Sequence, residues 1–285
     1  GRKLCLCNFL WHYILIIDMK LAIFLIGIVC LAVFIIVYMK PPIISVERPP
    51  MDPQGNTLFA CTTFLAKPKK FKELDRALST FLQHYDGDQI REFLVINEYS
   101  DTDTSDKIAY LREKYPFITF ISKTSDQSGQ AKSLNMMIDH LKTHNYKYWL
   151  RWEESWYSLK PYFKDAHKIM ETSDIDQLQF TYEWRDVPDE RRKQEQKYLR
   201  ILRREHYKDK LWSGSTIDDW PLYSLRPCLD RVSTILKIGR FDESPEKWPV
   251  HFEYDYALKW VKSGNKGVYD DFIVTRNANH KSTYH

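Results

Sequence analysis

Between residues 57 and 152 the chain alternates short apolar runs with stretches of helical periodicity, and this alternation limits the fold more than any other feature. Strands separated by helices in this way are joined by right-handed crossovers into a parallel sheet. The sequence therefore predicts an α/β fold with a doubly wound sheet and a less regular C-terminal half after Trp156. The predicted strands are residues 57–64, 91–97, 117–122 and 147–152. In the second half we predict a mixed-charge helical run at 188–210 and helices at 229–238 and 252–263, the last two ended by Gly239 and Gly264.

The first part of the chain differs in kind from the rest. Residues 21–39 carry no charged side chain, and a helix of that length, at ~1.5 Å per residue, spans the ~30 Å hydrocarbon layer of a bilayer. No small-residue cleavage site follows, so we predict a retained signal-anchor helix. We expect an N-terminal extension at residues 1–20, a proline-rich stem at 40–56 and one globular domain at 57–285. This order predicts a single-pass type II membrane protein, of the endoplasmic reticulum or Golgi type in a eukaryotic cell.

Charge and cysteine content exclude several classes of protein. The net charge is +4, and basic residues are interspersed with acidic ones, which argues against a nucleic-acid partner. Of the five cysteines, only Cys61 and Cys228 lie outside the N-terminal apolar part. They are far apart and in apolar surroundings, so we predict buried free thiols and neither a zinc cluster nor a disulfide framework.

Acidic residues follow two of the predicted strands. Glu98 comes just after the second strand, and Glu153 and Glu154 follow the fourth. Ligands of doubly wound sheets bind at the carboxyl ends of strands, so these carboxylates are candidates for holding a metal or a charged substrate. The alternative is that they are solvated residues at the mouth of a loop.

A second candidate lies at the start of the helix after the third strand. Gly129 allows a ligand to approach the backbone, the helix start offers unpaired N–H groups, and Lys132 adds a positive charge. These features predict a cradle for a diphosphate. An ordinary junction between a loop and a helix with an exposed lysine is the alternative.

Together, these segments resemble a family 2 glycosyltransferase with the GT-A fold, over roughly residues 57–280. Residues 96–101 resemble the motif whose acid binds the nucleobase, and residues 129–135 are similar to the Gly-x-Ala-x-x-x-Asn signature. The resemblance implies that the nucleotide-sugar donor, most often a UDP-sugar in this family, is bound by the following residues: Thr62, Thr63, Glu98, Gly129, Lys132, Asn135 and Glu154.

Residues 252–260 followed by Gly264 resemble the late acidic motif that supplies the catalytic base. The resemblance places Glu253 at the position of the base, with Asp255 as the alternative. Capping of a helix N-terminus would also explain both acids. The implied reaction is transfer of a sugar with inversion to a glycan, glycoprotein or lipid-linked acceptor, as the base takes the proton of the acceptor hydroxyl.

The resemblance also implies a divalent cation, Mn²⁺ or Mg²⁺, because hard oxygen ligands suit these ions and the cation neutralises charge on the leaving diphosphate. Residues 152–156 occupy the place of the metal motif, with Glu153 as a ligand. Ser155 stands where the last acid of that motif usually lies, and His280 is the implied additional ligand. The sequence thus leaves two hypotheses open: an active transferase, or a catalytically degenerate relative that binds a nucleotide sugar or glycan.

Two tryptophans are candidates for stacking on the sugar rings of an acceptor, Trp156 and Trp220. Packing in the core is the alternative for any single tryptophan. For Trp156, which follows the acidic pair, we favour stacking on the acceptor.

Overall fold

The computed structural model describes residues 24–29, 43–180, 200–201, 223–244, 251–269 and 273–276. The chain divides into two units, Gly1–Ile44 and Ser45–His285. Within the first unit residues 24–29 are helical, and most of the predicted anchor at 21–39 and all of the extension at 1–20 lie outside the described residues. No helix in the described ranges combines the length and apolar character needed to cross a membrane.

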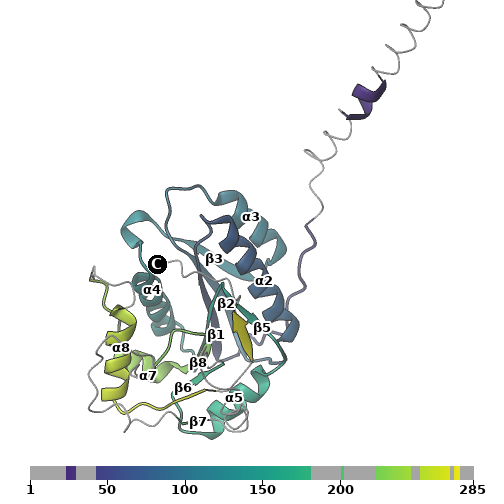
Figure 1. Cartoon of the computed structure of the whole chain (residues 1–285). Coiled ribbons are helices and arrows are strands. Elements are labelled where there is room, and N and C mark those ends of the chain that lie inside the picture. The colour runs from purple at the N-terminus through teal and green to yellow at the C-terminus, as the bar shows by residue number, and fades with distance from the viewer. Residues whose placement is uncertain are drawn as a thin grey trace, which may run out of the picture. The chain divides into compact units, whose positions relative to one another are not determined.

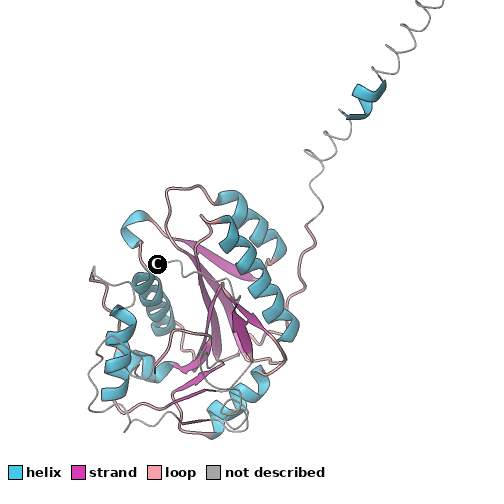
Figure 2. Ribbon diagram, viewed as in Figure 1, coloured by secondary structure: helices cyan, strands magenta, loops and turns pink. Residues whose placement is uncertain are grey.

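The second unit is built on a sheet of eight strands among the described residues, in the order β3-β2-β1-β4-β8-β6-β9-β7 (Figures 1 and 2). Strands β3, β2, β1 and β4 pair in parallel, whereas β8 and β7 run antiparallel to their neighbours. A separate antiparallel pair joins β5 (Trp156–Ser158) to β10 (Val274–Arg276). The bounds in the main sheet are β1 (Thr57–Thr63), β2 (Ile90–Asn97), β3 (Ile118–Ser122), β4 (Tyr148–Glu153), β6 (Gln177–Gln179), β7 (Arg200–Ile201), β8 (Cys228–Arg231) and β9 (Gly267–Tyr269).

Helices cover both faces of this sheet, and two apolar clusters form the core. One face, called the α2 face below, packs against α2 (Pro68–His84), α3 (Ser105–Lys114) and α5 (Phe163–Thr172). The other, the α4 face, packs against α4 (Gln130–Thr143), α7 (Val232–Ile238) and α8 (His251–Lys262). A short 3-10 turn, η1 (Ser125–Gln127), precedes α4.

The predicted α/β fold and its first four strands are confirmed. Helices α7 and α8 are followed by Gly239 and Gly264, with φ of 90° and 81°, as expected for glycines that end helices. The predicted helix at 229–238 is wrong in its first turn, where β8 adds to the sheet beside β4. The predicted helical run at 188–210 contains the two residues of β7, and its other residues lie outside the described ranges.

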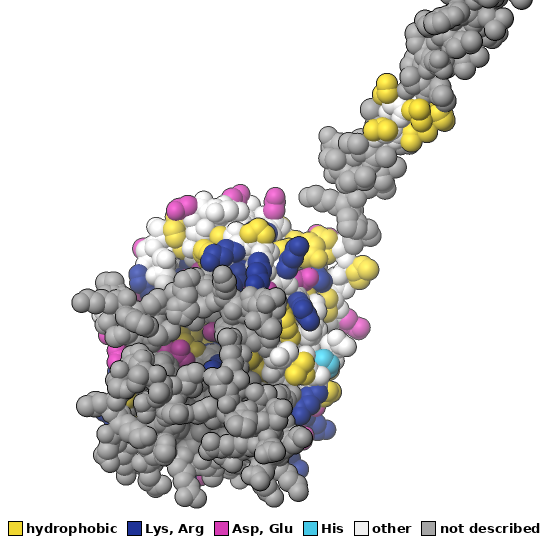
Figure 3. Space-filling model, in the orientation of Figure 1, with side chains coloured by type: hydrophobic (Ala, Val, Ile, Leu, Met, Phe, Trp, Pro, Cys, Tyr) yellow, Lys and Arg dark blue, Asp and Glu magenta, His cyan; other side chains and the backbone are white. Residues whose placement is uncertain are grey.

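Cys61 and Cys228 are buried free thiols, as predicted. Burial raises the pKa of the Cys61 thiol, and the charges of Glu154 and Glu153 raise it further. On the described part of the face shown in Figure 3, acidic, basic and apolar side chains lie together.

Candidate active site

The carboxyl ends of β1, β2 and β4 meet at one edge of the sheet. Thr62 is the register partner of Ile96 on one side and of Glu153 on the other. Side chains alternate between faces along a strand, and Ala60 belongs to the core of the α4 face, so Thr62 is directed to that face. Glu98 contacts α4, and Glu153 shares its face with Trp149 by the same alternation. The fold thus brings Thr62, Glu98 and Glu153 together on the α4 face, whereas the alternation directs Thr63 to the α2 face.

Glu98 lies in a buried ion pair. Its Oε2 accepts a hydrogen bond from Lys123 Nζ at 2.7 Å, and Ser133 Oγ donates to its Oε1. Lys123 Nζ also donates to the carbonyl of Gly129 at 2.8 Å. Burial lowers the pKa of Lys123, while the hydrogen bond and charge of Glu98 oppose that shift. The predicted nucleobase acid is therefore also the internal counter-ion of a buried lysine.

The start of α4 contacts a carboxylate of the protein itself. Gly129, the N-cap residue, has φ of 113°, a backbone conformation that favours glycine. Its N–H donates to Glu98 Oε2 at 3.3 Å, and Lys132 Nζ donates to the carbonyl of Asp126 at 2.6 Å. Within the predicted diphosphate cradle, the N–H of Gly129 thus contacts an internal carboxylate, and the binding of a diphosphate there stays a prediction.

Glu154 is directed away from this group, toward α2. Its Oε1 lies 2.7 Å from Lys70 Nζ, and Lys70 also lies 3.3 Å from Glu73 Oε2. Burial raises the pKa of Glu154, and the charge of Lys70 opposes the shift. The expectation that Glu154 contacts the donor therefore does not match its position: Glu154 follows the end of β4, and its carboxylate pairs with Lys70 on α2.

The predicted metal ligands are only partly described. Glu153 Oε2 accepts a hydrogen bond from the indole N–H of Trp156 at 3.3 Å, and Ser155 is buried. His280 lies outside the described residues. Within the described ranges no group of three or more His, Cys, Asp or Glu side chains could hold a metal ion. The described residues by themselves therefore do not fit a metal centre.

Trp156 occupies the core, contrary to the expectation that it stacks on an acceptor. Only 1% of its surface is exposed, and it belongs to the apolar cluster of the α2 face. Its carbonyl accepts the indole N–H of Trp152 at 3.0 Å. A stacking platform needs an exposed ring face, so burial excludes that role in this conformation. The second acceptor candidate, Trp220, lies outside the described residues.

Asn135 fastens α4 to the segment that follows α7. Its Oδ1 accepts the N–H of Phe241 at 2.8 Å, and its Nδ2 donates to the carbonyl of Phe241 and to Glu243. The side chain is buried. Its observed contacts are thus internal, and its part in donor binding stays a prediction.

The two candidates for the base lie in the first turns of α8. Glu253 Oε1 accepts the backbone N–H of Leu225 at 2.9 Å, and both Glu253 and Asp255 are partly buried. Side chains two positions apart on a helix do not share a face. Glu253 therefore faces the segment 223–225, and Asp255 is turned from it.

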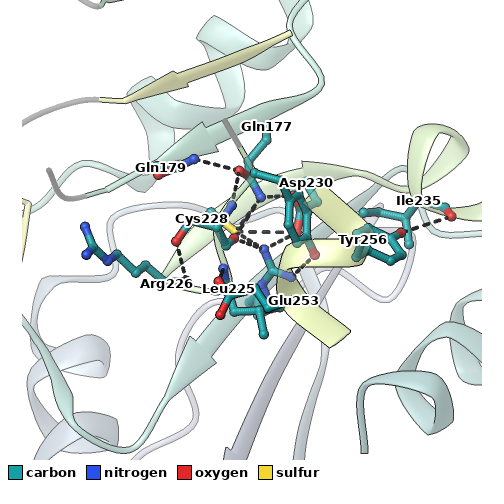
Figure 4. Close-up of polar contacts among 12 residues, drawn as sticks. Gln177, Gln179, Leu225, Arg226, Cys228, Asp230, Ile235, Glu253 and Tyr256 are labelled. Carbon is teal, nitrogen blue, oxygen red and sulfur yellow. Dashed lines mark hydrogen bonds and ion pairs between the residues drawn. The ribbon is translucent and has the colours of Figure 1, made fainter. Parts of the chain in front are cut away.

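Behind Glu253 lies a buried polar cluster that sequence reasoning missed (Figure 4). Arg151 Nη2 lies 3.2 Å from Asp230 Oδ2 and donates to the carbonyl of Ser224 at 2.6 Å. Arg151 also donates to the hydroxyl of Tyr223, and Gln177 Nε2 donates to Asp230 Oδ1 at 2.7 Å. The one available signal was Arg151 itself, a charge inside an otherwise apolar strand.

Comparison with known proteins identifies the fold. No family model matches the chain, and no curated protein matches it in sequence. The mannosyltransferase PcManGT from Pyrobaculum calidifontis, in complex with GDP-Man and Mn²⁺, matches with a TM-score of 0.55 at 14% identity, over 87% of this chain and 63% of that one. TarS 1-349 from S. aureus, in complex with UDP-GlcNAc, matches with a TM-score of 0.53 at 16% identity, over 81% of this chain and 61% of that one. The chain has a GT-A-like fold. It spans less than two thirds of the length of either GT-A-like structure.

Proposed function

We propose that this chain is an inverting glycosyltransferase that moves a sugar from a nucleotide-diphosphate donor to a glycan, glycoprotein or lipid-linked acceptor. The observation that carries the proposal is that carboxylates far apart in the sequence share the α4 side of the sheet. Glu153 ends β4, and Glu253 is linked through the segment 223–225 to Arg151 on the same strand. The GT-A-like fold supports this reading, because the solved structures that share it bind UDP-GlcNAc or GDP-Man.

In the proposed reaction Glu253 accepts the proton of the acceptor hydroxyl while that oxygen attacks the anomeric carbon and the nucleoside diphosphate leaves. One displacement of this kind inverts the anomeric centre. We assign the contacts with the nucleoside to Thr62 and Glu98, which lie at the ends of the neighbouring strands β1 and β2. A UDP-sugar remains our first choice of donor, with GDP-Man as the second.

We propose that a divalent cation, Mn²⁺ or Mg²⁺, is bound by Glu153, Ser155 and His280. A cation would neutralise the leaving diphosphate. Because the described residues do not complete a metal centre, the proton transfer above is assigned to the residues of the chain alone.

The test is hydrolysis and transfer from UDP-GlcNAc and GDP-Man by the full chain, with and without Mn²⁺, followed by NMR of the anomeric product. We expect turnover that Glu253→Gln lowers by at least about a hundredfold, with inverted product. Turnover that survives Glu253→Gln and Asp255→Asn, or product with retained configuration, would exclude this mechanism.

A second candidate function is binding of a nucleotide sugar or glycan without transfer. Two observations favour it: Ser155 takes the place of an acid, and Glu154 is paired with Lys70. It predicts that UDP-GlcNAc or GDP-Man raises the melting temperature while neither is consumed. The transferase predicts consumption as well as stabilisation.

The membrane location is a proposal from the sequence alone. Residues 21–39 would anchor the chain and hold the GT-A-like unit near acceptors at a bilayer. Membrane fractionation of the full chain beside a variant lacking residues 21–39 tests it. Recovery of both in the same fraction would argue against an anchor.

A further inference from the structure

A single peptide group separates the buried cation Arg151 from the carboxylate of Glu253. Arg151 Nη2 donates to the carbonyl of Ser224 at 2.6 Å, and the N–H of Leu225 donates to Glu253 Oε1 at 2.9 Å. That carbonyl and that N–H belong to the same planar amide. No described peptide bond is cis, so the two groups point to opposite edges of the amide plane. Arg151 and Glu253 therefore hold the same peptide from opposite sides.

The peptide is fixed by more than Arg151. Gln177 donates to the carbonyl of Ser224 at 3.1 Å and accepts the N–H of Ser224 at 3.3 Å. The hydroxyl of Tyr223 accepts a hydrogen bond from Arg151. Figure 4 shows Gln177, Leu225, Asp230 and Glu253 within this cluster. The segment 223–225 is thereby pinned to β4 and β6, and its orientation cannot change without breaking buried hydrogen bonds.

A hydrogen bond from a cation to the amide carbonyl polarises the amide, which strengthens the bond that its N–H donates. Arg151 is itself fixed by Asp230 at 3.2 Å, and both side chains are buried. Asp255, two positions along α8, has a different direction and does not share this arrangement. The contacts thus select one of the two acids.

We propose that Arg151 is a positioning residue for the Glu253 carboxylate, acting through the Ser224–Leu225 peptide, and that this assigns the base of the transfer reaction to Glu253. The assignment of the base rests on the proposed function. The linkage between Arg151 and Glu253 does not, and it can be measured without turnover.

The experiment uses the full chain and two matched substitutions, Tyr223→Phe and Tyr115→Phe. Each removes a hydroxyl from a fully buried tyrosine. The first hydroxyl accepts from Arg151, whereas the second donates to Asp75 on the α2 face. The double variant Arg151→Met/Asp230→Asn removes the ion pair without leaving one buried charge alone. Folding of each is checked by thermal melting.

We expect faster hydrogen exchange at the Leu225 amide in Tyr223→Phe and in the double variant, by about tenfold or more, and no change in Tyr115→Phe. With donor and acceptor, kcat falls by about ten- to a hundredfold in the double variant while KM for the donor is unchanged. Equal Leu225 exchange in Tyr223→Phe, the double variant and the wild type overturns the proposal, as does the same loss of kcat in Tyr115→Phe. If the wild type shows no turnover but exchange at the Leu225 amide still becomes faster in Tyr223→Phe and the double variant, the proposed transferase function is refuted. The linkage between Arg151 and Glu253 is then retained.

Discussion

Lys123 Nζ donates a hydrogen bond to Glu98 Oε2 across 2.7 Å, and both side chains are buried behind the first turn of α4. Because the same carboxylate also accepts the N–H of Gly129, the pair fixes the start of α4 against the end of β2. The ion pair therefore holds the start of α4 in place whether or not Glu98 touches a ligand.

We expect Lys123→Met to destabilise the protein by about 3–5 kcal/mol, because it leaves the buried Glu98 carboxylate without its counter-ion. Lys123→Met/Glu98→Gln should recover part of that loss. Urea unfolding followed by circular dichroism measures both. The control is Lys132→Met on the same helix start. Its Nζ donates to the carbonyl of Asp126, and its replacement should change stability by less than about 0.5 kcal/mol. Equal effects of the two single substitutions would contradict a structural role for the pair.

Glu153 and Glu154 are adjacent, and replacing each with glutamine should separate a role in metal binding from a role in stability. Glu154→Gln should lower stability by about 1–3 kcal/mol, because it removes one of the two carboxylates around Lys70. Glu153→Gln should leave stability unchanged and weaken Mn²⁺ binding, measured by titration calorimetry with nucleotide present. If Glu154→Gln weakens Mn²⁺ binding as much as Glu153→Gln, the assignment of Glu154 to the α2 face is wrong for the bound state.

Trp156→Ala should destabilise the protein by about 3–5 kcal/mol, the usual cost of emptying a large buried aromatic site. The side chain is 1% exposed and lies within an apolar cluster. Leu159→Ala, at a side chain that is 47% exposed, should cost less than about 0.5 kcal/mol. Chemical denaturation compares the two. A small cost for Trp156→Ala together with a raised KM for the acceptor would restore the stacking hypothesis.

Protonation of Glu92 should lower the free energy of unfolding as the pH falls. Hydrogen bonds from His140 and then from Tyr146 lower its pKa, although burial opposes them. The folded protein thus binds a proton less readily here than the unfolded chain. The contribution to stability is complete above the ordinary carboxyl pKa of 4.5 and is lost as the pH falls through the lower folded value.

In Glu92→Gln the unfolding free energy should depend less steeply on pH below about 4.5, as measured by urea denaturation across that range. Tyr146→Phe, which removes one of the two donors, should give an intermediate slope. Identical slopes in wild type and Glu92→Gln would show that this contact does not contribute.

Local pattern was enough to predict the first half of the domain. Strands β1 to β4 are apolar runs separated by stretches of helical periodicity, so their positions follow from residue order to within about one residue at each end. Strand β8 was missed because the apolar residues from Leu229 onward also fit a helix. A strand of four residues is made by pairing with β4 and β6, and that pairing is a tertiary contact invisible to local periodicity.

The position of acids after strands was likewise readable, but their partners were not. Nothing near Glu98 or Glu154 in the sequence indicates Lys123 or Lys70, since a counter-ion is selected by distance in space. The same holds for Trp156, whose neighbours favoured an exposed role and whose packing against α2-face residues gave it a buried one.

By itself, the sequence determined the α/β alternation, the edge of the sheet where the acids gather and the glycines that end α7 and α8, because each depends on residues within a few positions of one another. Only the tertiary structure decided that Glu154 pairs with Lys70, that Glu98 is a counter-ion, and that Arg151 and Glu253 hydrogen-bond to one peptide. Those relationships arise where separate strands and helices pack. The free energy of that packing depends on distances between atoms, and these distances cannot be read from the order of residues along the chain.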